Sequence, residues 1–265
     1  VSEGYVEDCI RRMRSIVPSI HLELGPMEAE SYAPLTAAGA EGLVVYQETY
    51  NRSVYAEMHT AGPKKDFDWR LDCAERGYRA GFKRLGIGAL LGLWDLREEA
   101  MALAAHVEYL LKHCWKSLIT VSLPRLRPAA GGFEPKHPVC DRDLIQIVCA
   151  LRAVFPQIGI VLSTREPPRL RDRMIPLGVT IMSAGSHTEP GGYTGAGKED
   201  LHRTSRGLRQ EIESEGEHAT EQFSIADNRS VEEVAGRIRE LGYEPVWKDW
   251  DEALAEPAQN LEDRS

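Results

Sequence analysis

Three consecutive segments decide the fold: LITVSL at 118–123, DRDLIQIVCALRAVF at 141–155 and IGIVLS at 158–163. The first and third are short apolar runs rich in β-branched residues, which favour β-strands. The middle segment repeats apolar residues every three to four positions, as an amphipathic helix does, and Asp141 is expected to cap it. Because the strands are apolar on both faces, the pattern predicts a parallel sheet covered by helices.

The same alternation extends through most of the 265 residues. Further strand-like runs lie at 20–24, 43–47, 84–90 and 179–183, and helix-like stretches lie at 26–38, 68–80, 97–114 and 168–177. The strands begin about 32 residues apart, and a (βα)8 barrel uses about 30 residues per unit. Gly39, Gly81 and Gly178 follow helices, where C-terminal caps favour glycine. We therefore predict an α/β fold: six of the eight units of a TIM-type barrel, with a helical carboxyl-terminal extension.

A doubly wound sheet would also accommodate six strands. Such a sheet usually carries its phosphate-binding glycines after the first strand, whereas Leu24 is followed here by Gly-Pro-Met-Glu. The segment GIGALLG at 86–92 resembles the dinucleotide motif, but its third glycine comes one position late. A dinucleotide site is therefore not expected.

The two ends of the chain depart from the strand–helix alternation. The chain opens on an amphipathic segment, Tyr5–Ile16, and a helix there would need a preceding strand to pack on. We therefore expect that the first two barrel units are missing. After Ser183 the sequence becomes polar, and 198–222 is predicted to be a mobile connection or an exposed helix. A final helix is predicted at 227–242, with Ser230 and Glu233 as a capping box. The expected domains are a partial barrel over 1–193 and an extension over 194–265.

Composition limits the possible functions. The net charge of −9 argues against a nucleic-acid binder that relies on bulk electrostatics. No apolar run approaches the 18 residues of a membrane span, and no leader opens the chain, so a cytoplasmic location is the expectation. The five cysteines are odd in number and form no CxxC pair. A disulfide framework and a zinc ribbon are therefore not expected, and no metal ligands are assigned.

Polar residues gather where the predicted strands end, which is where barrel enzymes place their sites. These residues are Gln47 and Glu48, Arg125 and Arg127, Arg165 and Glu166, and Ser183. Guanidinium groups bind carboxylates bidentately, so the set suits an amino acid with its carboxylate and ammonium groups. No catalytic residue is assigned from the pattern alone.

Structural roles remain open for the same side chains. Arg125 and Arg127 could pair with acidic neighbours at the rim, Arg165 could pair with Glu166, and Gln47-Glu48 could cap a helix at 51–58. A metal site at His106 and His113, a Cys140–His137 pair and a serine nucleophile at Ser183 or Ser186 are all disfavoured, because each lacks the partners it needs. Trp247 and Trp250 are expected to be core or docking aromatics.

Six segments carry a resemblance that covers about residues 5–255. They are VYQETYNRSVYAEMHTAGPKKDFDWRL (45–71), GIGALLGL (86–93), VSLPRLRPAAGGFEP (121–135), LSTREPPRLRD (162–172), MSAGSHTEPGGY (182–193) and EPVWKDWD (244–251). Together they resemble the tyrosine lyases of thiamine thiazole biosynthesis, the 2-iminoacetate synthase family of the radical S-adenosylmethionine superfamily. The biotin and thiamine synthesis-associated region of that family would begin within the last barrel units.

The resemblance implies both chemistry and partners. A 4Fe-4S cluster would reductively cleave S-adenosyl-L-methionine, and the resulting radical would take a hydrogen from L-tyrosine. Cleavage of the Cα–Cβ bond would release p-cresol and 2-iminoacetate. The implied protein partners are the thiazole synthase and a reductant such as flavodoxin or ferredoxin.

The resemblance also implies roles for individual residues. Glu48 and Arg70 would hold the adenosylmethionine, with Arg70 pairing with its carboxylate. Gly86 and Gly88 would let the strand backbone approach the adenine. Arg165 and Ser183 would anchor the tyrosine carboxylate, with Gln47, Arg125 and Arg127 as secondary candidates in the same site.

One departure from the family is large. The CxxxCxxC motif that ligates the cluster is absent, as is the glycine-glutamate turn after the second strand of the barrel. We therefore expect this chain to be a carboxyl-terminal fragment that is inactive alone. Two alternatives stay open. One is the related tyrosine lyase of hydrogenase cofactor maturation, although no cysteine follows Cys149 here. The other is a non-catalytic module that binds an amino acid or a partner.

Overall fold

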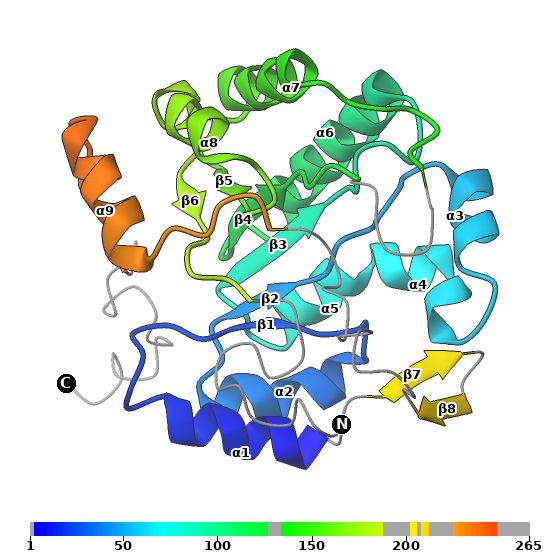
Figure 1. Ribbon diagram of the computed structural model, residues 1–265. Coiled ribbons are helices and arrows are strands. Elements are labelled where there is room, and N and C mark those ends of the chain that lie inside the picture. The colour runs from blue at the N-terminus through cyan, green and yellow to red at the C-terminus, as the bar shows by residue number, and fades with distance from the viewer. Residues whose placement is uncertain (1–2, 127–133, 188–201, 206–207, 212–224, 248–265) are drawn as a thin grey trace.

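A computed structural model describes residues 3–126, 134–187, 202–205, 208–211 and 225–247. In these residues six parallel strands form one sheet in the order β1-β2-β3-β4-β5-β6, and a separate antiparallel pair joins β7 to β8 (Figure 1). The strands are β1 His21–Glu23, β2 Gly42–Val44, β3 Arg84–Gly88, β4 Leu118–Ser122, β5 Gly159–Leu162, β6 Ile181–Met182, β7 His202–Ser205 and β8 Leu208–Glu211.

Each of the strands β1 to β5 is followed by helix, and the next strand pairs directly beside it. The α-helices are α1 Glu3–Met13, α2 Ala29–Ala38, α3 Arg52–Met58, α4 Phe67–Leu71, α5 Cys73–Arg79, α6 Leu96–His113, α7 Asp141–Val154, α8 Pro168–Met174 and α9 Val231–Glu240. Short 3-10 turns lie at Pro63–Lys65 and Ile175–Leu177. Sequential strand order excludes the doubly wound alternative, in which the order reverses.

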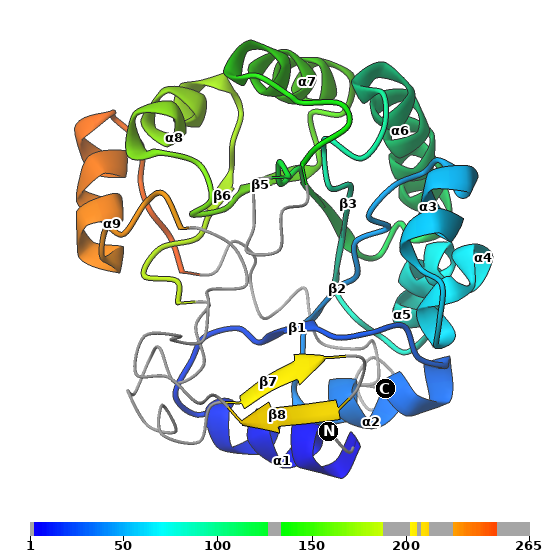
Figure 2. The ribbon, with the colours of Figure 1, turned by 45° about the vertical axis from the view of Figure 1, so that its right-hand side comes forward.

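The helices form an incomplete ring around the sheet (Figure 2). It runs from α1 and α2, past α5 and α6, to α7, α8 and α9. The prediction of a partial (βα) barrel with six strands is confirmed. Within the described residues no helix is long and apolar enough to cross a membrane.

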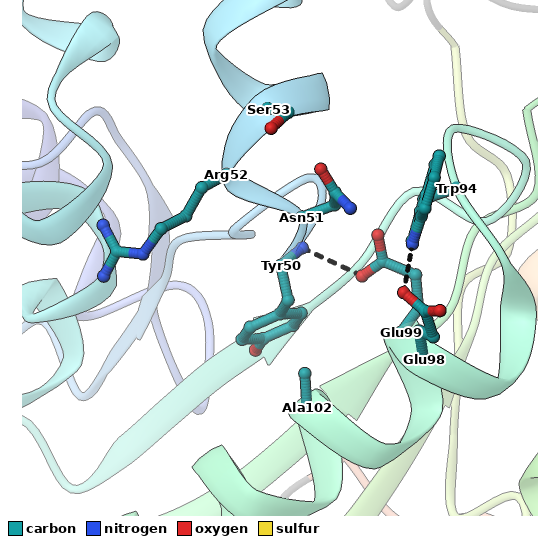
Figure 3. A pocket seen from close by; sticks show the side chains of 8 residues that line it. All are labelled: Tyr50, Asn51, Arg52, Ser53, Trp94, Glu98, Glu99 and Ala102. Atoms are coloured by element: carbon teal, nitrogen blue, oxygen red, sulfur yellow. Dashed lines mark hydrogen bonds between the residues drawn. The ribbon is translucent and has the colours of Figure 1, made fainter.

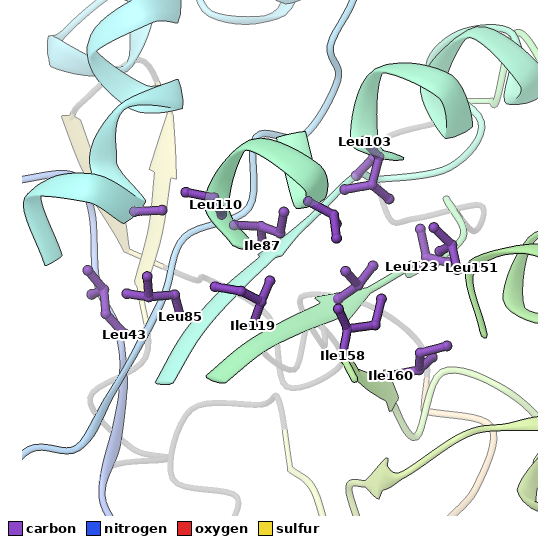
Figure 4. Packing of buried hydrophobic residues seen from close by; sticks show 14 of the residues in the cluster. Leu43, Leu85, Ile87, Leu103, Leu110, Ile119, Leu123, Leu151, Ile158 and Ile160 are labelled. Carbon is purple, nitrogen blue, oxygen red and sulfur yellow. The ribbon is translucent and has the colours of Figure 1, made fainter. Parts of the chain in front are cut away.

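The core lies between the sheet and these outer helices. Leu85 and Ile87 of β3 and Ile119 of β4 are at most 2% exposed, and they belong to one cluster with Leu103 and Leu110 of α6 (Figure 4). These strand residues are alternate positions, because successive side chains of a strand point to opposite faces. The other set of alternate residues therefore faces the concave side of the half-barrel.

Glycines on the concave face allow close packing across the strands. A Cβ atom on Gly86 would lie 2.8 Å from a Val44 methyl carbon and 3.3 Å from the Thr120 hydroxyl oxygen. A Cβ atom on Gly88 would lie 2.1 Å from the Ser122 carbonyl oxygen and 3.1 Å from the Tyr46 ring. Larger side chains of β2 and β4 thus fill the space over β3.

Several local predictions need correction. The helix expected at 68–80 divides into α4 and α5, because Asp72 ends the first and begins the second. The N-cap of α7 is Cys140 rather than Asp141, and Asp143 accepts from its backbone N–H at 3.0 Å. The Gln47-Glu48 pair does not cap α3, because Asn51 does so by accepting from the Val54 N–H.

The carboxyl-terminal predictions meet a mixed outcome. The capping box of Ser230 and Glu233 is confirmed at the start of α9. Part of the segment 198–222 forms the β7–β8 pair instead of a helix. Trp247 is 70% exposed, and Trp250 lies outside the described residues.

Candidate functional site at the carboxyl ends of the strands

The candidate site, here called the mouth, is formed by the residues at and just beyond the carboxyl ends of β1–β6. Tyr46, Gln47 and Glu48 follow β2, and Arg165 and Ser183 follow β5 and β6. Because all six strands run parallel, these ends meet at one edge of the sheet. The predicted grouping of polar residues at the strand ends therefore follows from the topology.

Glu48 has an unusual backbone conformation. Its φ of 71° is the only positive value for a non-glycine residue in the described part of the chain. Its carbonyl oxygen accepts from the Leu90 N–H at 2.7 Å, and the preceding Gln47 N–H donates to the Gly88 carbonyl oxygen at 3.0 Å. A left-handed non-glycine residue persists only where its surroundings fix it, and such residues cluster at functional sites.

Arg70 fixes the Glu48 side chain. This arginine of α4 is only 6% exposed. Its Nε donates to the Tyr46 carbonyl oxygen at 2.7 Å, and its Nη2 donates to Glu48 Oε1 at 3.0 Å. The third nitrogen, Nη1, is buried and makes no hydrogen bond to any residue that the structure describes. A buried donor of this kind suits a carboxylate ligand beside Glu48.

Glu99, a residue that the sequence analysis missed, holds the turn after Glu48. This α6 residue is 2% exposed, and its Oε2 accepts from the Tyr50 N–H at 2.9 Å (Figure 3). Its Oε1 accepts from the Thr49 hydroxyl. Burial raises the pKa of Glu99. The contact spans 50 residues of sequence, so no local motif could have indicated it. Glu99 also lines a cavity of about 340 Å³ behind the turn.

Tyr50 of the same turn pairs with His106 of α6, and both residues are partly buried. The Tyr50 hydroxyl and His106 Nδ1 are 2.8 Å apart, and the two rings pack edge to face. Burial lowers the pKa of His106 to about 4. The histidine is therefore neutral at pH 7, and its hydrogen bond to the Tyr50 hydroxyl fits a structural role.

A pH-dependent stability is expected from His106. Below the ordinary histidine pKa of 6.5, His106 is protonated in the unfolded chain. In the folded chain it stays neutral until the pH falls to about 4. The free energy of unfolding should therefore fall across this window, with His106 contributing up to about 3 kcal/mol. Urea titrations from pH 7 to pH 4 should show wild type losing its advantage over His106→Phe, which retains a ring against Tyr50. A difference independent of pH would contradict the assignment.

Opposite charges face one another on the concave side of the mouth. Burial, then repulsion from Glu48, raises the pKa of Glu23, while Arg165 lowers it. Burial raises the pKa of Tyr46 to about 12, and Glu23 contributes to that shift. Burial lowers the pKa of Arg165, an effect opposed by Tyr46 and both carboxylates. Glu23 and Tyr46 were not among the predicted site residues, although their alternate positions along β1 and β2 indicate the concave face.

Arg125 occupies a different environment from Arg165. Its Nε donates to Glu166 Oε1 at 2.9 Å, and its Nη2 contacts both Glu166 and Asp141. Its Nη1 donates to the Val139 carbonyl oxygen at 3.0 Å. All three nitrogens are thus used in a pair that is buried rather than at the rim, so the structure favours the expected pairing with acidic neighbours over substrate binding for Arg125. Glu166 pairs with Arg125, and its charge also acts on Arg165. Arg127 lies outside the described residues.

Ser183 lies on the loop after β6. Its N–H donates to the Leu162 carbonyl oxygen at 3.2 Å, which continues the sheet beyond β6. Its carbonyl oxygen accepts a hydrogen bond from Arg171 Nη2. The structure thus brings together Gln47, Glu48, Arg70 and Gly88, with Arg165 facing Glu48 and Ser183 on the neighbouring loop.

The cysteines do not provide a cluster site. Cys73 and Cys114 are buried, and Cys140 is exposed. Cys9 and Cys149 are half-buried and lie on α1 and α7. Among the described residues, which include all five cysteines, no group of three or more metal-binding side chains converges. Since a 4Fe-4S cluster needs converging thiolates, the residues present do not fit one.

A second cavity lies away from the turn at Glu48. Its volume is about 680 Å³, and it is lined by residues of β6, α9 and the start of β1, including Arg84 and Trp247. His21 and Arg84 begin β1 and β3, whereas Met182 ends β6, so this cavity extends along β6 as well as the starts of β1 and β3.

Two solved structures share the fold of this chain. The fold matches that of methylornithine synthase, PylB, with a TM-score of 0.63 at 16% identity, over 92% of this chain and 64% of that one. It also matches the FeFe-hydrogenase maturase HydG from Carboxydothermus hydrogenoformans, with a TM-score of 0.77 at 34% identity, over 93% of this chain and 53% of that one. Residues 122–244 match the Biotin and Thiamin Synthesis associated domain.

The sequence then gives the particular relatives. The chain is 40% identical to 2-iminoacetate synthase from Escherichia coli K12 over 98% of its own length. It spans 64% of the length of that relative. The chain is therefore similar in sequence to 2-iminoacetate synthases over nearly all of its own length, and the expected resemblance is confirmed.

Proposed function

We propose that this chain is the substrate-binding part of a 2-iminoacetate synthase. That enzyme would cleave the Cα–Cβ bond of L-tyrosine to give 2-iminoacetate and p-cresol. The observation that carries the proposal is the charged mouth, where Arg165 faces Glu23 and Glu48, in a chain 40% identical to such a synthase. An amino acid presents one carboxylate and one ammonium group. The mouth offers a guanidinium group for the carboxylate and carboxylates for the ammonium group.

Arg165 and Ser183 would bind the tyrosine carboxylate. A guanidinium group that is partly withdrawn from water forms strong, directional hydrogen bonds to a carboxylate. Glu23 would accept a hydrogen bond from the substrate ammonium, and the action of its charge on Arg165 and Tyr46 supports this role. Gln47 is 2% exposed and donates from its side chain to the Phe67 carbonyl oxygen at 3.4 Å, so it would support the site from behind.

Glu48 and Arg70 would hold S-adenosyl-L-methionine. The free Nη1 of Arg70 among the described residues fits the methionine carboxylate, and Glu48 fits its polar groups. When bound beside a reduced cluster, adenosylmethionine supplies the capacity to abstract a hydrogen atom. The cysteines of this chain do not fit a 4Fe-4S cluster, so the proposal assigns no cluster step to its residues. A reductant such as flavodoxin or ferredoxin and a thiazole synthase that receives the product remain proposed partners.

Two other functions have specific support. The HydG structure is 34% identical to this chain, which favours the lyase of hydrogenase cofactor maturation as the second candidate. A non-catalytic amino-acid-binding module is supported by the lack of CxxxCxxC in these 265 residues. The DNA upstream of Val1 distinguishes the module from both enzymes, because an in-frame CxxxCxxC motif is expected only for the enzymes.

Formation of p-cresol tests the proposed reaction. We expect a fusion of the amino-terminal part of the Escherichia coli synthase to this chain to form p-cresol from L-tyrosine, under anaerobic conditions with adenosylmethionine and dithionite. This chain alone should form none, because three thiolates cannot converge on a cluster. The product is measured by chromatography. p-Cresol from the chain alone would overturn the expectation of inactivity, and a folded, cluster-loaded fusion without product would contradict the reaction.

A further inference from the structure

A short peptide from the carboxyl-terminal region joins two loops of the mouth. The N–H groups of Ala226 and Asp227 both donate to the Thr164 carbonyl oxygen, at 3.0 and 3.1 Å. The Gly185 N–H donates to the Arg229 carbonyl oxygen at 3.2 Å. The peptide 226–229, here called the clasp, therefore bonds to the loop that carries Arg165 and to the loop that carries Ser183.

A fully buried ion pair lies beneath the clasp. The side chains of Arg171, on α8, and Asp227 both have 0% exposure, and Arg171 Nη1 donates to Asp227 Oδ2. The second nitrogen of Arg171, Nη2, donates to the Ser183 carbonyl oxygen. One guanidinium group thus binds the clasp and the Ser183 loop at the same time.

The ion pair continues outward to α9. Arg229 Nη2 contacts Asp227 Oδ2 at 2.7 Å and Asp172 Oδ1 at 3.0 Å. Arg237 Nε contacts Asp172 Oδ2 at 3.0 Å. The Asp172 side chain is 19% exposed and that of Arg237 is 40% exposed, so the charged side chains of the network are more solvated than Arg171 and Asp227. Asp172 therefore offers a matched acidic residue in the same network: it contacts the clasp through Arg229, but among the described residues it makes no ion pair with either loop of the mouth.

A buried ion pair adds little to the free energy of unfolding, because apolar residues of similar volume often stabilise a protein equally well. The Arg171–Asp227 pair does, however, hold its two segments in one geometry. Here the geometry is the spacing between the loop of Arg165 and the loop of Ser183, two residues that the proposed function assigns to one carboxylate. A carboxylate bound by both residues requires that spacing to be fixed.

We propose that Asp227 and Arg171 are positioning residues for the substrate carboxylate, acting through the clasp on Arg165 and Ser183. The inference rests on the proposed function of the mouth. Asp227 and Arg171 touch no substrate in this arrangement. They are expected to control how strongly the site prefers a ligand with a carboxylate over one without it.

Paired ligands separate positioning from a general structural role. L-Tyrosine and tyramine differ only by the carboxylate, and each is titrated calorimetrically into wild type, Asp227→Asn, Arg171→Lys and the control Asp172→Asn. Arg171→Lys retains the buried charge and protects the fold, but one ammonium group cannot reproduce the two-sided contact. The measured quantity is the ratio of tyramine Kd to tyrosine Kd.

We expect this ratio to fall by about tenfold or more in Asp227→Asn and Arg171→Lys, and to stay within about twofold in Asp172→Asn. Parallel loss of both affinities, or an unchanged ratio in a folded Arg171→Lys protein, would overturn the inference. Arg165→Ala serves as the reference. If it removes the preference while the clasp variants do not, the inference fails and the proposed function stands. If wild type shows no preference, the proposed function itself fails.

Discussion

Replacing Arg165 with alanine is expected to weaken L-tyrosine binding by about a hundredfold, or about 3 kcal/mol. The loss follows because a charge-assisted, bidentate contact is removed and the substrate carboxylate keeps no equivalent cation. The charges of Glu23 and Glu48 act on Arg165, and burial lowers the pKa of this arginine, so its guanidinium is partly withdrawn from water within the mouth. Calorimetric titration of L-tyrosine into the two proteins measures the change directly.

The matched control is Arg169→Ala, which removes an exposed arginine of α8 only four residues along the chain. It should leave the tyrosine Kd unchanged within about twofold, because exposed charges contribute little. Arg165→Lys should retain part of the affinity, since a point charge remains but the fork of donors does not. If Arg165→Ala binds tyrosine as tightly as wild type, Arg165 is a structural partner of its acidic neighbours.

Replacing Gly88 with alanine is expected to destabilise the half-barrel by about 3 kcal/mol or more, the upper range for overpacking. The new Cβ would lie 2.1 Å from the Ser122 carbonyl oxygen, which is backbone and paired within the β3–β4 register. Relief would require the two strands to move apart. Urea unfolding of the variant measures the loss.

Gly236→Ala in α9 provides the control, because no atom lies within 4 Å of its added Cβ. That substitution should stabilise the protein by about 0.5 to 1 kcal/mol, since alanine restricts the unfolded chain. A Gly88→Ala protein within about 1 kcal/mol of wild type would show that the two strands tolerate a wider separation.

The fold was largely predictable from the sequence because its signals are local. Apolar runs such as 118–123 and 158–163 mark strands wherever they occur, and the parallel sheet follows from their alternation with amphipathic helices. Boundaries were less predictable. The break at Asp72 is a matter of backbone conformation between two helices, and helical periodicity continues across it. Cys140 takes the cap expected of Asp141 because Asp143 completes the capping arrangement.

The candidate site was predictable in position but not in partnership. Parallel topology places Glu48 and Arg165 at the same edge, so their grouping follows from strand order alone. The choice of Arg125 as the partner of Glu166 depends on contacts across 41 residues of sequence. Glu99 supports the Glu48 turn from a helix that follows the next strand, and its burial is visible only in three dimensions.

The central claim is that the mouth of this half-barrel recognises tyrosine as an amino acid. The most direct test is calorimetric titration of the wild-type chain with L-tyrosine and with tyramine. The account predicts saturable binding of L-tyrosine, with tyramine bound at least about tenfold more weakly because Arg165 and Ser183 lose their ligand. Equal affinity for the two compounds, or no binding of tyrosine by the folded chain, would contradict it.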